Sequence, residues 1–518
     1  WRLELALWPD GDAERAQRLA ERTLDSAERP GDAGWQRIPA ALPGPVTAGS
    51  ILVLTAQPAG EAPAGAPPRL GVPRALTPRP EATGRRNVVL VSLDTLRADR
   101  LSISGAERPT SPTLDALARQ GVHFRTALAP SSSTPPSHMT MLTGTIPCRH
   151  GIFGIHVEDR LPDDLETLAE ILARSGYTTA AITENAYVGA PYGFARGFDS
   201  FREIKQKIAD GNSPAPGVIT PTGHGPVTFA AANDWLRAHR DQRFFLFVHT
   251  YQMHGPRRPP EPYSRLFRDE ASPEPSPSPG FDPAFHDLTR YDQLLRQVDD
   301  LMAGLLRTLD ELRLGDDTIL IVTSDHGEAF FEHGDHGHGF SLWEEVTRVP
   351  LILSAPGLAK PGAIDEPVGL ADIVPTVLDL VGIAVPSGLD GRSHAAQVTG
   401  ASAEEPLPPW SSERAIYMET APGNVRAARD GRYKVIREED GRERLFDLAE
   451  DPGETRDLAG SAAEAELPAE RLTRLRTVLD RGGFRCQMRR EELAKARTGA
   501  TALDPERRDK LRALGYAE

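Results

Sequence analysis

The stretch NVVLVSLD, Asn87–Asp94, decides how this chain folds. An almost continuous run of apolar, often β-branched residues is typical of a strand buried on both faces, as in a parallel sheet covered by helices. The run ends in an aspartate, and two other runs have the same form: FFLFVH at 244–249 and TILIVTSD at 318–325. In open parallel sheets ligands bind beyond the carboxyl ends of strands, so we expect these polar residues to converge.

Helical segments alternate with these strands. SPTLDALARQG at 111–121 has a capping serine, a proline at the first helical position and a terminal glycine. LETLAEILARSG at 165–176 repeats the pattern, and residues 291–315 carry apolar side chains at helical spacing. This alternation predicts an α/β fold with a mostly parallel central sheet flanked by helices.

Composition divides the 518 residues into four regions. Short strand patterns joined by turns such as Asp430-Gly431 predict a small antiparallel sheet late in the chain. Near the start, strands are expected at 1–8 and 50–56 and a helix at Asp12–Arg22, followed by a Pro- and Ala-rich linker. The predicted regions are an N-terminal accessory region, β-rich, with its linker (1–85), an α/β catalytic domain (86–385), a small-sheet subdomain (386–460) and a helical tail (461–518).

Charge and cysteine content limit the partners and the crosslinks. The formal net charge of −15 argues against nucleic acid or an anionic membrane as a partner, and no apolar run in the sequence is long enough for a transmembrane segment. Cys148 and Cys486 are the only cysteines. We expect two unpaired thiols, with one disulfide as the alternative.

The strand ends supply candidate ligands for a divalent metal. Asp94 ends one strand, Asp325 and His326 end another, and His249 and His254 follow a third. Two carboxylates and an imidazole suit a divalent cation. Asp94 alone is equally compatible with a solvated or capping side chain, whereas this alternative is less favoured for Asp325 and His326, which directly follow an apolar strand and precede Gly327. His249 is a candidate for a second metal, but nothing in the sequence determines this.

A second cluster lies in SDHGEAFFEHGDHGHGF, residues 324–340. Four of its residues, His333, Asp335, His336 and His338, follow one another closely in a chain with fourteen histidines. A Gly-rich loop with solvated imidazoles is the alternative. We expect at least one of them, His338 first, to contact a metal or an oxyanion.

The segment SSSTPPSHMTMLTG, residues 131–144, offers a nucleophile. A hydroxyl becomes a useful nucleophile when its proton is removed or a metal binds the alkoxide. Two prolines fix the backbone after Thr134, and a helix is expected to start near Ser137, where free amides favour an anion. The serines at 131–133 are compatible with simple turn residues.

Taken together, these segments resemble the sulfatase family of the alkaline phosphatase superfamily. The resemblance runs in family order over roughly four-fifths of the chain, through NVVLVSLDTLRADRLS, PTLDALARQGVHF, TPPSHMTMLTG, HGIFG, GFARGFDSF, TSDHGEAFFEHGDHGHG, TRVPLILSAPG, DIVPTVLDLVGI, YKVIREEDGRERLFDLAEDPGE and LRALGY. Sulfatases carry a C/S-x-P-S-R motif whose first residue is oxidised to formylglycine. This chain has Thr134 there and His138 in place of the arginine, and threonine cannot give that aldehyde.

The resemblance implies roles for individual residues. Asp94, Thr134, Asp325 and His326 would hold a divalent metal (Mn, Zn, Ca or Mg), and Thr134 would be the nucleophile. His254 would protonate the leaving oxygen, while His338 and His138 would bind non-bridging oxygens.

The chain also departs from the family pattern. Thr95 replaces a second aspartate, and His326 replaces an asparagine, which suits manganese or zinc better than calcium. The family's lysine- and histidine-bearing segment is missing where Glu184 and Asn185 stand.

Because related phosphodiesterases and phosphoryl transferases use an unmodified threonine, the expected activity is metal-dependent hydrolysis of phosphate or sulfate esters, with phosphate diesters or phosphonate monoesters favoured. The alternatives are a sulfuric ester hydrolase, a phosphoryl-group transferase, and an inactive sulfatase-like binding or structural module. The expected substrate is a small-molecule, glycan or lipid ester, and the resemblance implies a periplasmic or extracellular location. The natural substrate and the oligomeric state stay open.

Overall fold

The computed structural model describes residues 2–8, 17–23, 51–57, 86–154, 160–185, 187–204, 223–268, 283–401 and 414–498. The chain forms two compact units, Trp1–Thr77 and Pro78–Glu518.

The first unit contains a three-stranded antiparallel sheet of order β2-β1-β3. Strands β1 (Arg2–Trp8) and β3 (Ile51–Gln57) confirm the two strands expected there. The helix expected at 12–22 is wrong over its described part, because Gln17–Thr23 is strand β2 and pairs with β1. An isolated helix of that length is marginal without a packing surface, whereas β1 offers a complete ladder of backbone partners. The expected linker lies outside the described residues.

The second unit is built on a nine-stranded sheet of order β13-β5-β12-β9-β4-β8-β6-β7, with β14 also pairing with β5. The strands β9, β4, β8, β6 and β7 are parallel, and only β12 runs antiparallel to its neighbours. The mostly parallel sheet predicted from the sequence is therefore confirmed. The bounds are β4 Asn87–Leu93, β5 Val122–Leu128, β6 Thr178–Thr183, β7 Ser200–Glu203, β8 Phe244–Thr250, β9 Thr318–Thr323, β12 Arg348–Ser354, β13 Gly362–Ile364 and β14 Val368–Gly369.

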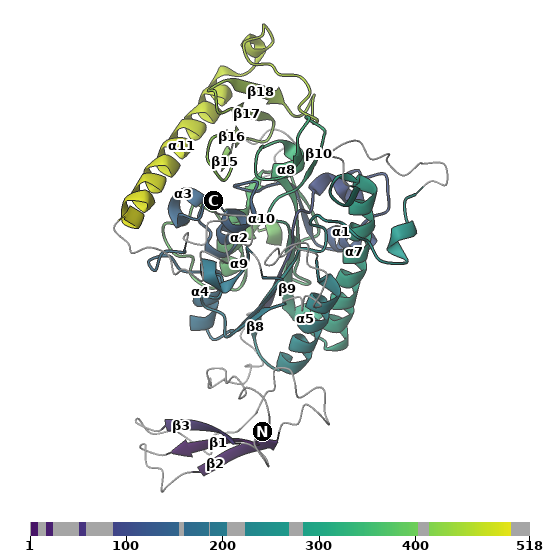
Figure 1. Ribbon diagram of the computed structural model, residues 1–518, viewed down its shortest axis with the longest axis vertical. Coiled ribbons are helices and arrows are strands. Elements are labelled where there is room, and N and C mark those ends of the chain that lie inside the picture. Colours follow the sequence, from purple (N-terminus) through teal and green to yellow (C-terminus); the bar gives the residue numbers. More distant parts are fainter. Residues whose placement is uncertain are drawn as a thin grey trace, which may run out of the picture. The chain divides into compact units, whose positions relative to one another are not determined.

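Helices cover both faces of this sheet (Figure 1). Val88 and Leu90 of β4 face a core shared with α2 (Thr134–Thr143), α4 (Leu168–Arg174) and α9 (Ile373–Leu380), and Val89 and Val91 face a core shared with α1 (Pro112–Gln120), α5 (Gly225–His239) and α7 (Leu288–Glu311). All four β4 side chains are fully buried. Each such burial stabilises the fold by about 1.5–3 kcal/mol, so the central strand is the firmest part of the scaffold that carries Asp94.

A four-stranded antiparallel sheet follows, as predicted. It runs β15 (Ile416–Glu419), β16 (Arg426–Arg429), β17 (Tyr433–Arg437) and β18 (Glu443–Asp447), and the long helix α11 (Ala469–Thr498) lies along it (Figure 1). The remaining elements are short: α3 Pro147–His150, α6 Pro283–His286, α8 Glu344–Thr347, α10 Ala395–Thr399, β10 Ala329–Phe330, β11 His336–Gly337, and 3-10 turns at Ala98–Arg100, Ser102–Ser104, Ala190–Tyr192, Tyr263–Arg265, Gly315–Asp317, Leu370–Asp372 and Glu464–Glu466.

Cys148 of α3 and Cys486 of α11 form a disulfide. The expectation of two unpaired thiols is therefore wrong. The two cysteines are 338 residues apart, and only the packing of α11 against α3 brings them together, which their spacing does not reveal.

Removing this crosslink should destabilise the second unit. Closing a long loop restricts the unfolded chain, and a native disulfide typically contributes about 2–4 kcal/mol. We expect the double variant Cys148→Ala/Cys486→Ala to melt at a lower temperature in differential scanning calorimetry. Reductant should lower the Tm of the wild type and leave that of the variant unchanged; equal Tm values would contradict the assignment.

A buried ionic network joins the small sheet to α8. Lys434 of β17 is fully buried, and its Nζ lies 3.1 Å from Glu344 Oε1 and 2.9 Å from Glu454 Oε1. Arg429 adds a second cation 2.6 Å from Glu344 Oε2. Burial, opposed by Lys434 and assisted by Glu344, raises the pKa of Glu454 from 4.5 to about 7.

The raised pKa of Glu454 makes stability depend on pH. Glu454 binds its proton more tightly in the folded state than in the unfolded state. The stability that this carboxyl contributes is therefore complete below pH 4.5 and is lost as the pH rises toward 7. Replacing Glu454 by glutamine keeps a neutral side chain at every pH. We expect the difference in Tm between Glu454→Gln and wild type to increase from pH 4.5 to pH 7; a constant difference would refute the protonated state.

Candidate active site

Parallel pairing gathers the predicted metal ligands at one edge of the sheet. Ser92 of β4 stands opposite His249 of β8 and Thr323 of β9, so Asp94 and Asp325 follow at neighbouring strand ends. Asp94, His249, Asp325 and His326 are all fully buried. The convergence expected from the sequence is confirmed for these four side chains.

Thr134 is the first residue of α2, directly after the extended Ser133. Its Oγ1 lies 3.2 Å from His326 Nε2 and donates toward Asp94 Oδ2 at 3.5 Å. The helix begins three residues earlier than expected, because Pro135 and Pro136 fall in its first turn, where the missing N–H groups cost nothing. The hydroxyl therefore sits at the positive end of the helix dipole, which favours an anionic group beside it.

The protein compensates the two carboxylates unequally. Burial acts against ionisation of Asp325, but His326, His138 and His249 outweigh it and lower the pKa of that carboxyl. Asp94 Oδ1 and Asp325 Oδ2 have no hydrogen-bond partner among the described residues. Burial, and then repulsion from Asp325, raises the pKa of Asp94 well above its usual value. Two adjacent buried carboxylates with unpaired oxygens are costly unless a cation accompanies them.

The donor set fits such a cation. Asp94, Asp325 and His326 each offer one ligand atom, and these atoms lie within 4.8 Å of one another. Two carboxylate oxygens and an imidazole nitrogen suit a divalent ion of the manganese or zinc type. A second group, Asp94 with His138 and His249, meets the same criterion.

His138 lies one turn into α2 and already has protein partners at both ring nitrogens. Its Nε2 is 2.9 Å from Ser92 Oγ, and its Nδ1 is 3.0 Å from the Thr134 carbonyl and 3.4 Å from Asp325 Oδ2. The ring thus holds the start of α2 against β4. Its predicted contact with substrate oxygens requires it to release one of these partners.

His254 and His338 stand side by side, with ring centroids 5.1 Å apart. His338 also lies 4.3 Å from the ring of His326, and its Nδ1 is 3.2 Å from Glu328 Oε1. Arg257, almost fully buried, pairs with the other oxygen of Glu328.

The two imidazoles differ in their proton affinity. Burial, reinforced by His338, lowers the pKa of His254 to about 4. Burial acts the same way on His338, but the Glu328 carboxylate outweighs it and raises the pKa. The Glu328 carboxylate thus makes His338 the more basic of the two imidazoles.

Sequence reasoning missed Glu328 and Arg257. Glu328 stands two residues after His326, so its place in the motif was a usable signal. Arg257 lies in the Pro-rich loop after β8, and no pattern there marks it.

The other candidates are placed away from the metal ligands. His333 stacks on Trp343 and bonds Glu345 at 2.8 Å, and His336 stacks on Phe331. Glu184 accepts hydrogen bonds from Thr228 and Thr250 hydroxyls and from two backbone amides, so it fastens the loop after β8.

Comparison with known proteins agrees with this geometry. Residues 86–383, more than half of the chain, match the Sulfatase family model, and residues 332–480 match the model described as N-sulphoglucosamine sulphohydrolase, C-terminal. The chain therefore belongs to the sulfatase family of the alkaline phosphatase superfamily, whose members are ester hydrolases.

The chain is only distantly similar to individual relatives, but the similarity extends over most of their length. The chain is 27% identical to the ulvan-active sulfatase of Formosa agariphila over 72% of this chain and 77% of that protein. It is 24% identical to the multifunctional alkaline phosphatase superfamily protein PehA of Trinickia caryophylli, covering 74% and 93%. The phosphonate monoester hydrolase of Agrobacterium radiobacter superposes with a TM-score of 0.60 at 22% identity, covering 76% and 96%. Among the described residues, no helix combines the length and apolarity needed to cross a membrane.

Metal binding should depend on the paired carboxylates. A ligand present at 100 times its Kd stabilises the folded state by about 2.7 kcal/mol. We expect Mn²⁺ or Zn²⁺ to raise the Tm of the wild type and of Asp115→Asn, which alters a buried carboxylate of α1, but not of Asp325→Asn. Mass spectrometry should find bound metal in the wild type and in Asp115→Asn but not in Asp325→Asn. Full metal occupancy of Asp325→Asn would exclude this site.

Proposed function

We propose that this protein hydrolyses phosphate or phosphonate esters with Thr134 as the nucleophile. One observation supports this above all: the Thr134 hydroxyl lies at the start of α2, within 3.5 Å of Asp94 and His326. Threonine stands where sulfatases form an aldehyde, so a hydroxyl must act directly. An activated hydroxyl in this position suits in-line attack on phosphorus.

Asp94, Asp325, His326 and Thr134 would hold a divalent cation. Bound there, the cation supplies positive charge that lowers the pKa of the hydroxyl and offsets charge on the attacked group. The positive end of the α2 helix dipole would favour the anionic ester beside Thr134. Burial of all these groups keeps bulk water away from them and strengthens each electrostatic contact.

The proton balance assigns the two imidazoles. The Thr134 hydroxyl would give its proton to the Asp94 carboxylate, toward which it donates, as Oγ1 forms a bond to phosphorus. The bond to the leaving oxygen breaks in the same step, and that oxygen needs a proton. We expected His254 to give it, but its pKa is lowered to about 4, whereas the Glu328 carboxylate raises the pKa of His338. His338 is thus the proposed donor. Having given up its proton, it would act as the base toward the water that attacks phosphorus, which breaks the bond to Thr134 Oγ1, frees the phosphate or phosphonate product and restores the Thr134 hydroxyl.

Sulfate ester hydrolysis is the second candidate. It is favoured by the family models and by the relatives named sulfatases. A sulfate monoester could occupy the same place at the start of α2. The distinction lies in the group that Thr134 attacks, and it can be measured directly.

The disulfide bears on location. Such bonds persist in oxidising compartments, and Cys148–Cys486 is of this kind. We therefore propose that the protein works in the periplasm or outside the cell.

Removing the Thr134 hydroxyl should abolish covalent turnover. We expect Thr134→Ala, reconstituted with Mn²⁺ or Zn²⁺, to lose about 10³-fold or more in kcat on bis(4-nitrophenyl) phosphate and a phenylphosphonate monoester. Thr140→Ala, also buried on α2, is the matched control and should remain active.

A sulfate monoester, 4-nitrophenyl sulfate, is assayed in parallel. Turnover of sulfate alone by the wild type would favour the second candidate over the first. Full activity of Thr134→Ala on any of these esters would remove Thr134 as the nucleophile.

A further inference from the structure

His249 of β8 is a buried imidazole without a good hydrogen bond at either ring nitrogen. Its side chain is fully buried, its Nδ1 has no hydrogen-bond partner among the described residues, and its Nε2 lies 3.4 Å from Asp94 Oδ2. Hydrogen bonds from N–H to oxygen usually span about 2.7–3.2 Å, so this contact is long. Because an unsatisfied buried polar group is costly, the ring indicates a partner that is not part of the chain.

His138 of α2 stands beside His249, with ring centroids 4.8 Å apart. Its Nδ1 lies 3.0 Å from the carbonyl oxygen of Thr134, which only accepts hydrogen bonds, so in the neutral ring Nδ1 carries the proton and Nε2 carries the lone pair. Metal-binding histidines typically donate from their other ring nitrogen in this way. Nε2 is 2.9 Å from Ser92 Oγ, and that hydroxyl can turn its proton away.

Asp94 supplies the third donor of this group. One atom each of Asp94, His138 and His249 lies within 4.8 Å of the others. Tetrahedral ligands about 2.1 Å from zinc are about 3.4 Å from one another, and His249 Nε2 and Asp94 Oδ2 are 3.4 Å apart. A carboxylate has about four lone-pair positions, so Asp94 can contact two ions and still accept the Thr134 hydroxyl.

The local charge is compatible with two divalent ions. Glu184 lies beside the carboxyl end of β8, where it accepts hydrogen bonds from the Thr250 hydroxyl and the Tyr251 amide. Among the residues that the structure describes, no lysine or arginine forms an ion pair with Asp94, Asp325 or Glu184. One divalent ion would leave these carboxylates with excess negative charge, whereas a second would reverse the sign and favour an anionic ester.

We propose that Asp94, His138 and His249 form a second cation site for a divalent transition metal of the zinc type. The Asp94 carboxylate is shared with the site that Asp325 and His326 help to form. Two imidazole nitrogens favour zinc over magnesium or calcium, and three protein ligands leave a fourth position for water or an ester oxygen. The inference goes beyond the proposed function, since it concerns a different ion and needs no nucleophile.

The test counts bound ions. Metal-free protein is saturated with Zn²⁺, separated from loosely bound ions by gel filtration and measured by native mass spectrometry. We expect two Zn²⁺ per wild-type chain and one in His249→Gln, which keeps a neutral polar side chain. Asp325→Asn should keep none, because Asp325 Oδ2 also lies 3.4 Å from His138 Nδ1 and so supports both sites.

His123→Gln is the matched control, because it changes another histidine of the central sheet, on β5. This variant should still bind two ions. Co²⁺ in place of Zn²⁺ adds a spectroscopic readout, since tetrahedral Co²⁺ absorbs visible light more strongly than octahedral Co²⁺. We expect the visible band to lose intensity in His249→Gln and to stay unchanged in His123→Gln.

A count of one ion in the wild type would overturn the second site, and this result depends on no variant. Two ions in His249→Gln would overturn it as well. Loss of both ions from His249→Gln, with a circular dichroism spectrum that matches the wild type, would place His249 in a single centre and reject the proposal.

Discussion

Two carboxylates held together against their mutual repulsion are the constraint on which this structure depends. Asp94 and Asp325 are fully buried, and each keeps one oxygen without a hydrogen bond among the described residues. Such a pair needs a rigid fold around it, and a cation beside it would offset its charge. The parallel ladders of β4 with β8 and β9, buried on both faces, supply the rigidity. His138 then fixes α2 to the same strand, so Thr134 is held on the same frame as Asp94.

What the sequence predicts well is what local patterns encode. NVVLVSL and TILIVTS are recognisable as buried strands because nearly every residue is apolar. A polar residue at the end of such a strand lies at the carboxyl edge of the sheet, where the other strand ends also meet. Thr134 stood out because of the two prolines behind it. The helix start was placed late since prolines normally discourage a helix, although they are tolerated in its first turn.

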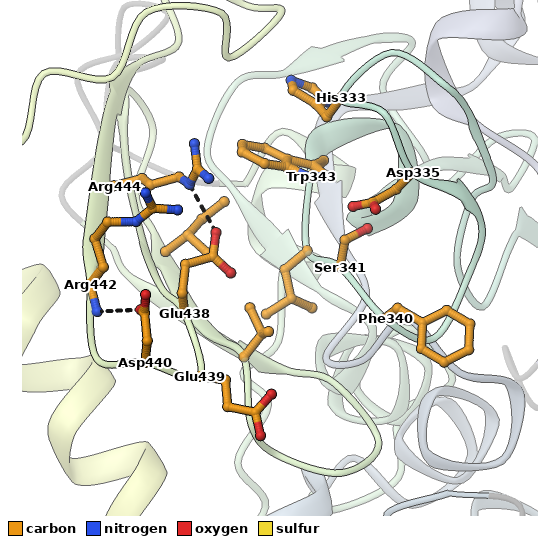
Figure 2. A pocket seen from close by; sticks show the side chains of 13 residues that line it. His333, Asp335, Phe340, Ser341, Trp343, Glu438, Glu439, Asp440, Arg442 and Arg444 are labelled. Carbon is orange, nitrogen blue, oxygen red and sulfur yellow. Dashed lines mark hydrogen bonds and ion pairs between the residues drawn. The ribbon is translucent and has the colours of Figure 1, made fainter.

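The missed features depend on contacts between distant segments. Arg257 acts through Glu328, 71 residues away, and Cys148 through Cys486, so neither has a local signature. The difference between His254 and His338 likewise arises from the Glu328 carboxylate, which bonds His338 and acts on His254 only through space. The small sheet also depends on contacts between distant segments. Its β17–β18 hairpin lines a pocket beside the His-rich loop, residues 324–340 (Figure 2), and Lys434 of β17 pairs with Glu344 of α8.

The disulfide determines what happens to the chain when its backbone is cut. It closes a ring that contains the proposed metal ligands Asp325 and His326 but neither Asp94 nor Thr134, together with the small sheet. A protease that cuts once anywhere within that ring leaves both fragments in one molecule, with α11 still attached to α3. The cut protein would migrate as an intact chain until it is reduced, and only then would its two pieces separate.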